Sequence, residues 1–337
     1  MPKVAHAQRT ICCHAAVALV LLGSIGGVRA WPLPPAQQES VAKVPSVHVI
    51  QSLPMDAASR GALTGAVKSR QYVQAERILI NAIRQNPKSP RLLSFLGGIY
   101  FLNGDYLESA VAMKKAEPLA PLNNPDRFTL AMAYVVLNHS DWAQPEIERL
   151  TRSDPRNALY FYWLSRINYN QNHFDQGIAA GQKAIQLDSR FTRAYDNLGL
   201  CYEALGDYNL AIQAYGQAIT LNRKNEPPSP WPPLDLGALL VKLNKPAEAR
   251  SYLLEALRDD PRFPEAHFRL GLLLQLEGKN QDAIEQFKKA AALNPSYAEP
   301  HYALGRSYER LGNTEQARAE FSLFEKLKRA NVKHKPQ

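Results

Sequence analysis

Histidine spacing is the first feature of this chain that could indicate chemistry. His267 and His301 are 34 residues apart, and two imidazoles on neighbouring helices could together bind a zinc ion. Neighbouring helices pack about 8–10 Å apart, however, whereas zinc–nitrogen bonds are only about 2 Å long. The alternative is that both rings fill one packing position of a repeated structure. We expect this packing role and predict no metal site.

Other catalytic motifs give no stronger signal. The sequence contains no His-Glu-x-x-His, Gly-x-Ser-x-Gly or Cys-x-x-Cys motif and no glycine-rich phosphate loop. Ser40 and Lys43 match Ser-x-x-Lys but lack the companion motifs. Cys201 lies among apolar residues, so we expect a buried core thiol, with a functional thiol as the alternative. We therefore predict a protein that is no enzyme and needs no cofactor.

Leucine-glycine pairs recur with a period of 34 residues. Leu236-Gly237, Leu270-Gly271 and Leu304-Gly305 follow one another at this interval, and Leu198-Gly199 lies three intervals after Leu96-Gly97. Such a period is typical of a repeat of two helices that buries its apolar faces by stacking on its neighbours.

Two other positions of the period predict how each repeat folds. Position 15 holds glycine or asparagine, which tolerate the left-handed conformation that ends a helix, in the form of Gly104, Asn138, Asn172, Gly206, Asn244, Gly278 and Gly312. Position 20 holds a small residue, which lets two helices approach closely, in the form of Ala75, Ser109, Ala143, Gly177, Ala211, Ala249, Ala283 and Ala317. Each repeat is therefore predicted to be a helix, a sharp turn and a second helix.

The segments "LGGIY" (96–100), "LGLCY" (198–202) and "LGRSY" (304–308) resemble the tetratricopeptide repeat family. This resemblance implies an all-α fold, a right-handed α-solenoid of about eight helix-turn-helix repeats. We place the repeats at 56–89, 90–123, 124–157, 158–191, 192–225, 230–263, 264–297 and 298–331. The proline-rich stretch 226–233 then reads as a four-residue insertion, 226–229, within one solenoid spanning 56–331, followed by a basic tail at 332–337.

The N-terminus predicts export. Lys3 and Arg9 precede an uncharged apolar run at 11–28, and small residues follow it, as in a signal peptide ending at residue 30. We expect a periplasmic or secreted protein; the alternative is an uncleaved membrane anchor at 11–28. Residues 31–55 are rich in proline and predict a flexible leader.

The formal net charge of +9 supports one alternative function, the binding of an anionic polymer or membrane surface through basic residues. Most basic residues are interspersed with acidic ones, which is typical of a solvated helix surface. The predicted export argues against nucleic acid as a partner.

The resemblance implies a protein or peptide partner, bound in a concave groove that the first helices line. Aromatic residues and arginine dominate binding hot spots, and both are dense in 160–170. The alternative is that these side chains only pack against the next repeat. The candidate groove residues are Phe95, Phe128, Tyr162, Trp163, Arg166, Tyr169, Asn170, Arg193, Asn197, Arg269, Tyr302 and Arg306. We predict a non-enzymatic scaffold for envelope assembly or secretion.

Overall fold

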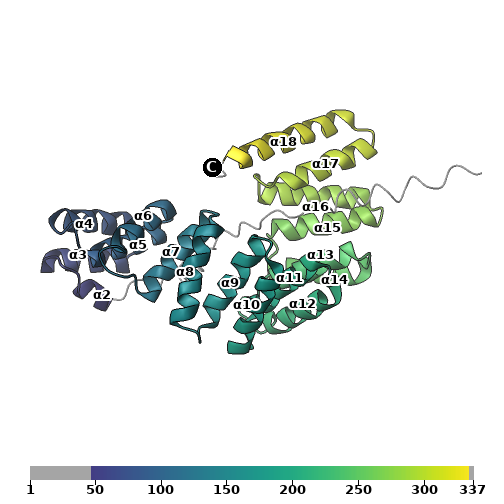
Figure 1. Cartoon of the computed structure of the whole chain (residues 1–337). Helices are drawn as coiled ribbons and strands as arrows, with labels where there is room; N and C mark the ends of the chain where they lie inside the picture. Colours follow the sequence, from purple (N-terminus) through teal and green to yellow (C-terminus); the bar gives the residue numbers. More distant parts are fainter. Residues whose placement is uncertain (1–46, 334–337) are drawn as a thin grey trace, which may run out of the picture. The chain divides into compact units, whose positions relative to one another are not determined.

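The computed structural model describes residues 47–333, which form 17 α-helices and no strand. Figure 1 shows the helices, which are α2 (Val47–Gln51), α3 (Ala57–Lys68), α4 (Tyr72–Gln85), α5 (Pro90–Asn103), α6 (Tyr106–Ala116), α7 (Asn124–Val136), α8 (Ser140–Ser153), α9 (Ala158–Asn170), α10 (Phe174–Leu187), α11 (Thr192–Leu205), α12 (Tyr208–Asn222), α13 (Trp231–Lys242), α14 (Pro246–Asp259), α15 (Pro264–Leu276), α16 (Asn280–Leu293), α17 (Ala298–Arg310) and α18 (Thr314–Lys333). The predicted all-α repeat fold is confirmed.

The described chain divides into two compact units, which we call the N-terminal unit (47–235) and the C-terminal unit (236–333). In the N-terminal unit each helix from α3 to α12 packs against the next, and in the C-terminal unit the helices from α14 to α18 do the same. The division falls within α13, a few residues after the predicted insertion at 226–229. The single continuous solenoid over 56–331 therefore stays a prediction.

Left-handed residues end the first helix of each repeat, as the sequence predicts. The four glycines and three asparagines at position 15 all have a positive φ, from 57° at Asn244 to 89° at Gly104. Arg70, at the same position of the first repeat, also has a φ of 55°. The chain thus reverses at one fixed point of the period.

Glycine at position 8 and a large side chain at position 24 hold the two helices of a repeat together. A Cβ atom on Gly199 would lie 2.4 Å from Cε1 of Tyr215, and one on Gly271 would lie 2.5 Å from Cε1 of Phe287. Gly305 has the same relation to Phe321, at 2.6 Å. Since carbon atoms in contact are about 3.5–4.0 Å apart, only glycine allows these rings to lie against the first helix.

The predicted flexible leader, 31–55, is wrong for its last residues. Helix α2 lies within it, and Ile50 and Leu53 are fully buried in the same core cluster as Leu63. The guanidinium of Arg60 also donates to the carbonyl of Met55 at 2.6 Å. A terminal repeat has an exposed apolar face that needs a cap, and α2 covers part of the first repeat. The predicted signal peptide and residues 31–46 lie outside the described residues.

The insertion at 226–229 is held by Asn222, which is almost completely buried. Its amide nitrogen donates to the carbonyl of Ser229 at 2.8 Å, and its amide oxygen accepts from the Ser229 N–H at 2.9 Å. Helix α13 then begins at Trp231, so Pro232 and Pro233 lie in its first turn. Proline is tolerated there because the first N–H groups of a helix have no partner within it.

The C-terminal helix is longer than predicted. Position 32 of the last repeat is Arg329 where five repeats have proline, and α18 continues to Lys333. The basic tail predicted at 332–337 therefore starts as helix. None of the helices described has the length and apolar character that crossing a membrane requires; the alternative anchor at 11–28 lies outside the described residues.

Candidate peptide-binding surface

Helices α9 and α11 carry the densest group of predicted groove residues. Helix α9 starts after Asn157, whose side-chain oxygen accepts from the N–H of Leu159 at 3.1 Å. The ring of Tyr162 lies 5.3 Å from that of Trp163 and 5.0 Å from that of Phe191, centroid to centroid. The guanidinium of Arg193 on α11 lies over the Tyr162 ring at 5.3 Å. These contacts form a continuous strip of aromatic and arginine side chains within the N-terminal unit.

The structure separates the twelve predicted residues by burial. Phe95, Phe128, Tyr162, Trp163, Arg166 and Asn197 are buried, whereas Tyr169, Asn170, Arg193, Arg269, Tyr302 and Arg306 are half-buried. Packing is therefore a main role of the first six, while the second six present polar or aromatic surface.

Within each unit the predicted residues make different contacts. Phe128, Tyr162 and Trp163 share one core cluster, but Phe95 belongs to another. In the C-terminal unit, Arg269 lies over the ring of Phe268 at 5.9 Å, and Tyr302 contacts Phe321 and Phe324. Within the N-terminal unit, the structure brings together the candidates on α7, α9 and α11, whereas Phe95 lies in a different cluster.

A buried polar network links α9 to α11. Arg166 donates to the Asn197 side-chain oxygen at 3.2 Å, and the Asn197 amide donates to the Ser165 hydroxyl at 2.7 Å. Ser165 in turn donates to the carbonyl of Gly177 at 2.6 Å. The fourth repeat has Gly181 at position 24, and a Cβ there would lie 3.0 Å from the Ser165 oxygen. The missing large side chain thus makes room for this network.

Polar atoms without a hydrogen-bond partner among the described residues gather on α9 and the residue after it. Two of these atoms are buried donors, Trp163 Nε1 and Arg166 Nη2. Three are buried acceptors, the side-chain oxygens of Asn168, Asn170 and Gln171. Buried polar groups are normally paired, so this helix differs from an ordinary packing element.

Cys201 is buried at the centre of the repeat, as predicted. Burial raises the pKa of its thiol to about 12, which the nearby Arg166 charge only partly opposes. In the variant Cys12→Ser/Cys13→Ser, which leaves Cys201 as the single cysteine of the sequence, we expect the native protein to resist a thiol reagent such as dithionitrobenzoate at pH 8, because the thiolate is the reactive form. The same protein in denaturant should react completely within minutes. Rapid reaction of the native protein would contradict the buried placement.

His267 and His301, the two histidines considered as metal ligands, each contact a polar side chain of their own repeat. Nδ1 of His267 lies 2.8 Å from the side-chain oxygen of Gln286, and Nδ1 of His301 lies 2.7 Å from a carboxylate oxygen of Glu320. Arg127 and Glu146 make the corresponding contact in the third repeat. Each contact joins position 4 to position 23 of one repeat. Among the described residues no group of three or more potential ligands could hold a metal ion.

The insertion after the fifth repeat adds a hollow that sequence reasoning missed. It has a volume of about 320 Å³ and is lined by residues that include Arg190, Arg193, Asp196, Asn225 and Trp231. Arg193 also belongs to the strip described above, so the hollow extends that surface. The four extra residues between repeats were the signal that could have located it.

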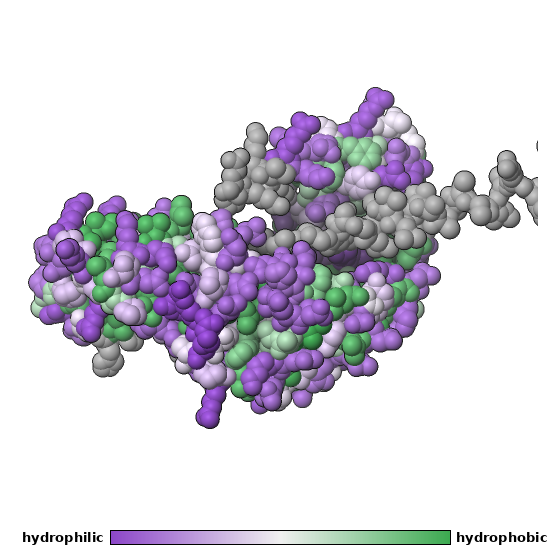
Figure 2. All heavy atoms as spheres, in the orientation of Figure 1, coloured by the Kyte–Doolittle hydropathy of each residue, from purple (hydrophilic) through white to green (hydrophobic). Residues whose placement is uncertain are grey.

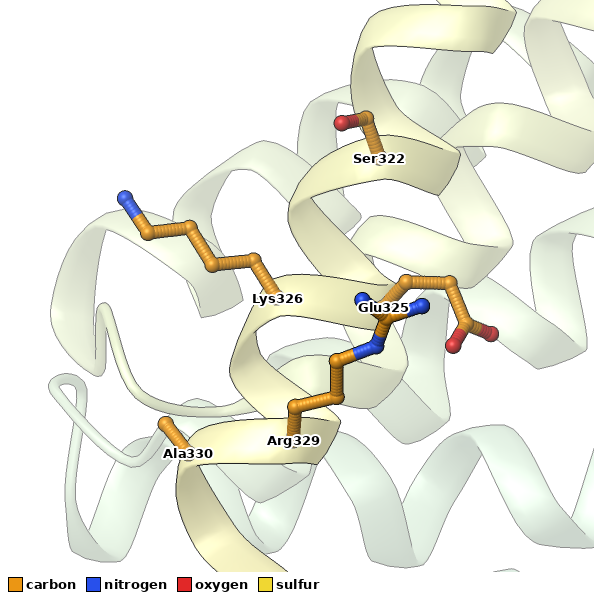
Figure 3. A pocket seen from close by; sticks show the side chains of 5 residues that line it. All are labelled: Ser322, Glu325, Lys326, Arg329 and Ala330. Atoms are coloured by element: carbon orange, nitrogen blue, oxygen red, sulfur yellow. The ribbon is translucent and has the colours of Figure 1, made fainter.

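A second hollow, of about 470 Å³, lies on α18 of the C-terminal unit. Figure 3 shows that Ser322, Glu325, Lys326, Arg329 and Ala330 line it. All five side chains are exposed and belong to one helix, so this is a shallow surface with charges of both signs.

Exposed apolar side chains lie on the second helices of the first three repeats. They are Val73, Leu107, Val111 and Trp142, and each is at least 44% exposed. Figure 2 shows hydrophobic surface over α4 and α6. Exposed apolar surface is common at contact sites, and none of these four residues was among the predicted site residues.

Comparison with known families identifies the class of protein. Models of the tetratricopeptide repeat match residues 62–124, 128–190 and 234–298, and further models of this repeat match 193–225 and 274–324. These matches cover more than half of the chain. The chain belongs to the tetratricopeptide repeat family, whose fold supports a protein–protein interaction scaffold.

Individual relatives agree with this fold. The chain is 25% identical over 171 residues to the human Protein O-mannosyl-transferase TMTC1, a match that covers 50% of this chain but 19% of that protein. A tetratricopeptide repeat protein from Parabacteroides merdae superposes with a TM-score of 0.65 at 16% identity, over 77% of this chain and 99% of that one. Yeast Tom70 gives a TM-score of 0.59 at 17% identity, over 85% and 65% of the two chains.

Proposed function

We propose that this protein is a non-enzymatic scaffold that binds a peptide segment of a partner on the surface of α9 and α11. The observation that carries the proposal is the strip formed by Tyr162, Trp163, Phe191 and Arg193. Aromatic residues and arginine supply most of the binding energy at protein interfaces.

The half-buried members of this surface are the residues that a partner would contact first. Tyr169 lies under the guanidinium of Arg166, with its ring centroid 5.4 Å from the guanidinium carbon. Arg193 lies at the border between the strip and the hollow beside the insertion. Tyr169 and Arg193 can be changed with less damage to the core than the buried Tyr162 and Trp163.

We further propose, from residues 1–30, that the protein acts outside the cytoplasm in envelope assembly or secretion. A basic start followed by an uncharged apolar run and small residues is typical of an export signal. Its partner would then be a peptide segment of another exported or envelope protein.

The test is cross-linking in intact cells followed by mass spectrometry. We expect the wild-type protein to capture a specific set of proteins from outside the cytoplasm. The double variant Tyr169→Ala/Arg193→Ala should lose most of this set, because it removes one aromatic and one cationic contact.

The matched control is Tyr208→Ala/Arg223→Ala, which removes the same residue types from α12 and its C-terminal end. It should retain the partners, and circular dichroism should show equal helix content in both variants. Retention of all partners by Tyr169→Ala/Arg193→Ala would contradict the proposed surface. Capture that instead falls steeply with salt and yields anionic polymer would favour the alternative function.

A further inference from the structure

Two buried arginines in the N-terminal unit have different electrostatic environments: one contacts carboxylates and the other a neutral amide. The Arg127 side chain, 11% exposed, pairs with the carboxylates of Glu117 and Glu146. Arg166 is 6% exposed, and within residues 47–333 it makes a hydrogen bond only to the neutral amide of Asn197. No carboxylate pairs with Arg166 among the described residues. Arg166 therefore lacks the counterion that Arg127 has, and burying a charge without a counterion is costly.

Trp163, Arg166 and Asn170 lie on one face of α9, because residues spaced by three and four follow the pitch of a helix. Each has a buried polar atom with no partner among the described residues: two donors, Trp163 Nε1 and Arg166 Nη2, and one acceptor, the Asn170 side-chain oxygen. A peptide segment carries acceptors and donors that could satisfy all three.

We propose that the peptide bound by this scaffold is acidic, and that one of its carboxylates forms an ion pair with Arg166. This inference rests on the proposed function and names the chemistry of its ligand. Hydrogen bonds between a guanidinium and a carboxylate are stronger than those between neutral groups. A carboxylate would therefore compensate the positive charge of Arg166, which the neutral amide of Asn197 does not.

Trp163 and Asn170 would bind other groups of the same peptide. The Trp163 N–H can donate to a main-chain carbonyl, and the Asn170 oxygen can accept from a main-chain N–H. The guanidinium of Arg166 lies over the half-buried ring of Tyr169, so a rotation of this ring would open Arg166 to the ligand. The carboxylate can come from an aspartate or glutamate side chain or from a peptide C-terminus.

Selection from a synthetic octapeptide library on the full chain tests the proposal. The library is prepared twice, with free C-terminal carboxylates and with C-terminal amides, and bound peptides are sequenced by mass spectrometry. We expect one enriched acidic position, or a preference for the free terminus, which distinguishes the two sources. Replacing that acid by its amide should weaken binding by about tenfold or more.

Three variants and one control separate ligand binding from folding. Arg166→Gln should abolish the preference for the acid over its amide, and Arg166→Lys should retain part of it because the charge remains. Trp163→Phe keeps an aromatic ring, although a smaller one, and removes the indole N–H donor, so it should weaken the binding of acidic and amide peptides equally. Arg156→Gln, which removes an exposed charge in the turn before α9, is the control and should bind as the wild type does. Hydrogen exchange of α9 and α11 reports whether each variant is folded.

The outcomes distinguish this inference from the function on which it rests. Peptides that bind without any preference for an acid would overturn the inference but would still support the proposed peptide-binding function. An acid preference that persists in folded Arg166→Gln would also overturn it. A library from which no peptide binds would contradict the proposed peptide-binding function itself. If Arg166→Gln does not fold, equal binding of acidic and amide peptides by Arg166→Lys would count against the ion pair.

Discussion

Replacing Tyr215 by alanine is expected to destabilise the N-terminal unit by about 3–5 kcal/mol, the usual cost of truncating a large buried aromatic side chain. Tyr215 is fully buried, and its ring occupies the space that Gly199 leaves open. Its hydroxyl also donates to Glu203 at 3.2 Å. The substitution would leave a cavity between α11 and α12 and remove one hydrogen bond from Glu203.

Hydrogen exchange measured by mass spectrometry is the suitable readout, because a repeat protein can unfold in parts. Exchange should accelerate most in α11 and α12. Leu210→Ala is the matched control, since Leu210 lies on the same helix but is 44% exposed. Exchange in Tyr215→Ala no faster than in Leu210→Ala would show that this packing contact does not stabilise the repeat.

Replacing Arg127 by alanine is expected to cost about 3–5 kcal/mol, because breaking a buried ion pair leaves its partner uncompensated. Arg127 joins Glu117 to Glu146, whose side chain is only 6% exposed. Arg149 remains within 3.1 Å of Glu146, which favours the lower end of this range. Urea denaturation followed by circular dichroism measures the loss.

A variant that removes both charges separates the ion pair from other effects of the substitution. Arg127→Met/Glu146→Met should be more stable than Arg127→Ala, because no buried charge is then left unpaired. Arg152→Ala breaks an exposed pair with Glu148 on the same helix, α8, and should change stability by less than about 1 kcal/mol. Equal losses in Arg127→Ala and Arg152→Ala would contradict the role of burial.

Arg127 occupies the same position of its repeat as His267 and His301 do in theirs, and this shared position is what the sequence could predict about the histidines. Position 4 contacts position 23 in the repeats that hold Arg127, His267 and His301. The period correctly placed both imidazoles at one packing position. It did not predict the polar side chain that each imidazole contacts. That partner lies 19 residues away, on the second helix, where sequence spacing alone does not show which side chains meet.

The candidate site was predicted only in part for a similar reason. Phe128, Tyr162 and Trp163 were chosen by residue type and position, and they do lie in one cluster. Their type did not indicate that they would be buried, whereas Tyr169 and Arg193 are half-buried. The network of Ser165, Arg166 and Asn197 joins residues 31 and 32 positions apart, and no local pattern predicts it.

The sequence by itself determined the two-helix repeat and the turn between its helices. Glycine or asparagine at position 15 and a small residue at position 20 act locally, on helix ends and on the close approach of two neighbouring helices. The tertiary structure alone decided that α2 covers the first repeat and that Asn222 holds the insertion. It also decided that Arg166 is buried without a carboxylate partner among the described residues. These features depend on side chains from different helices meeting in space, and a local period does not specify which of them meet.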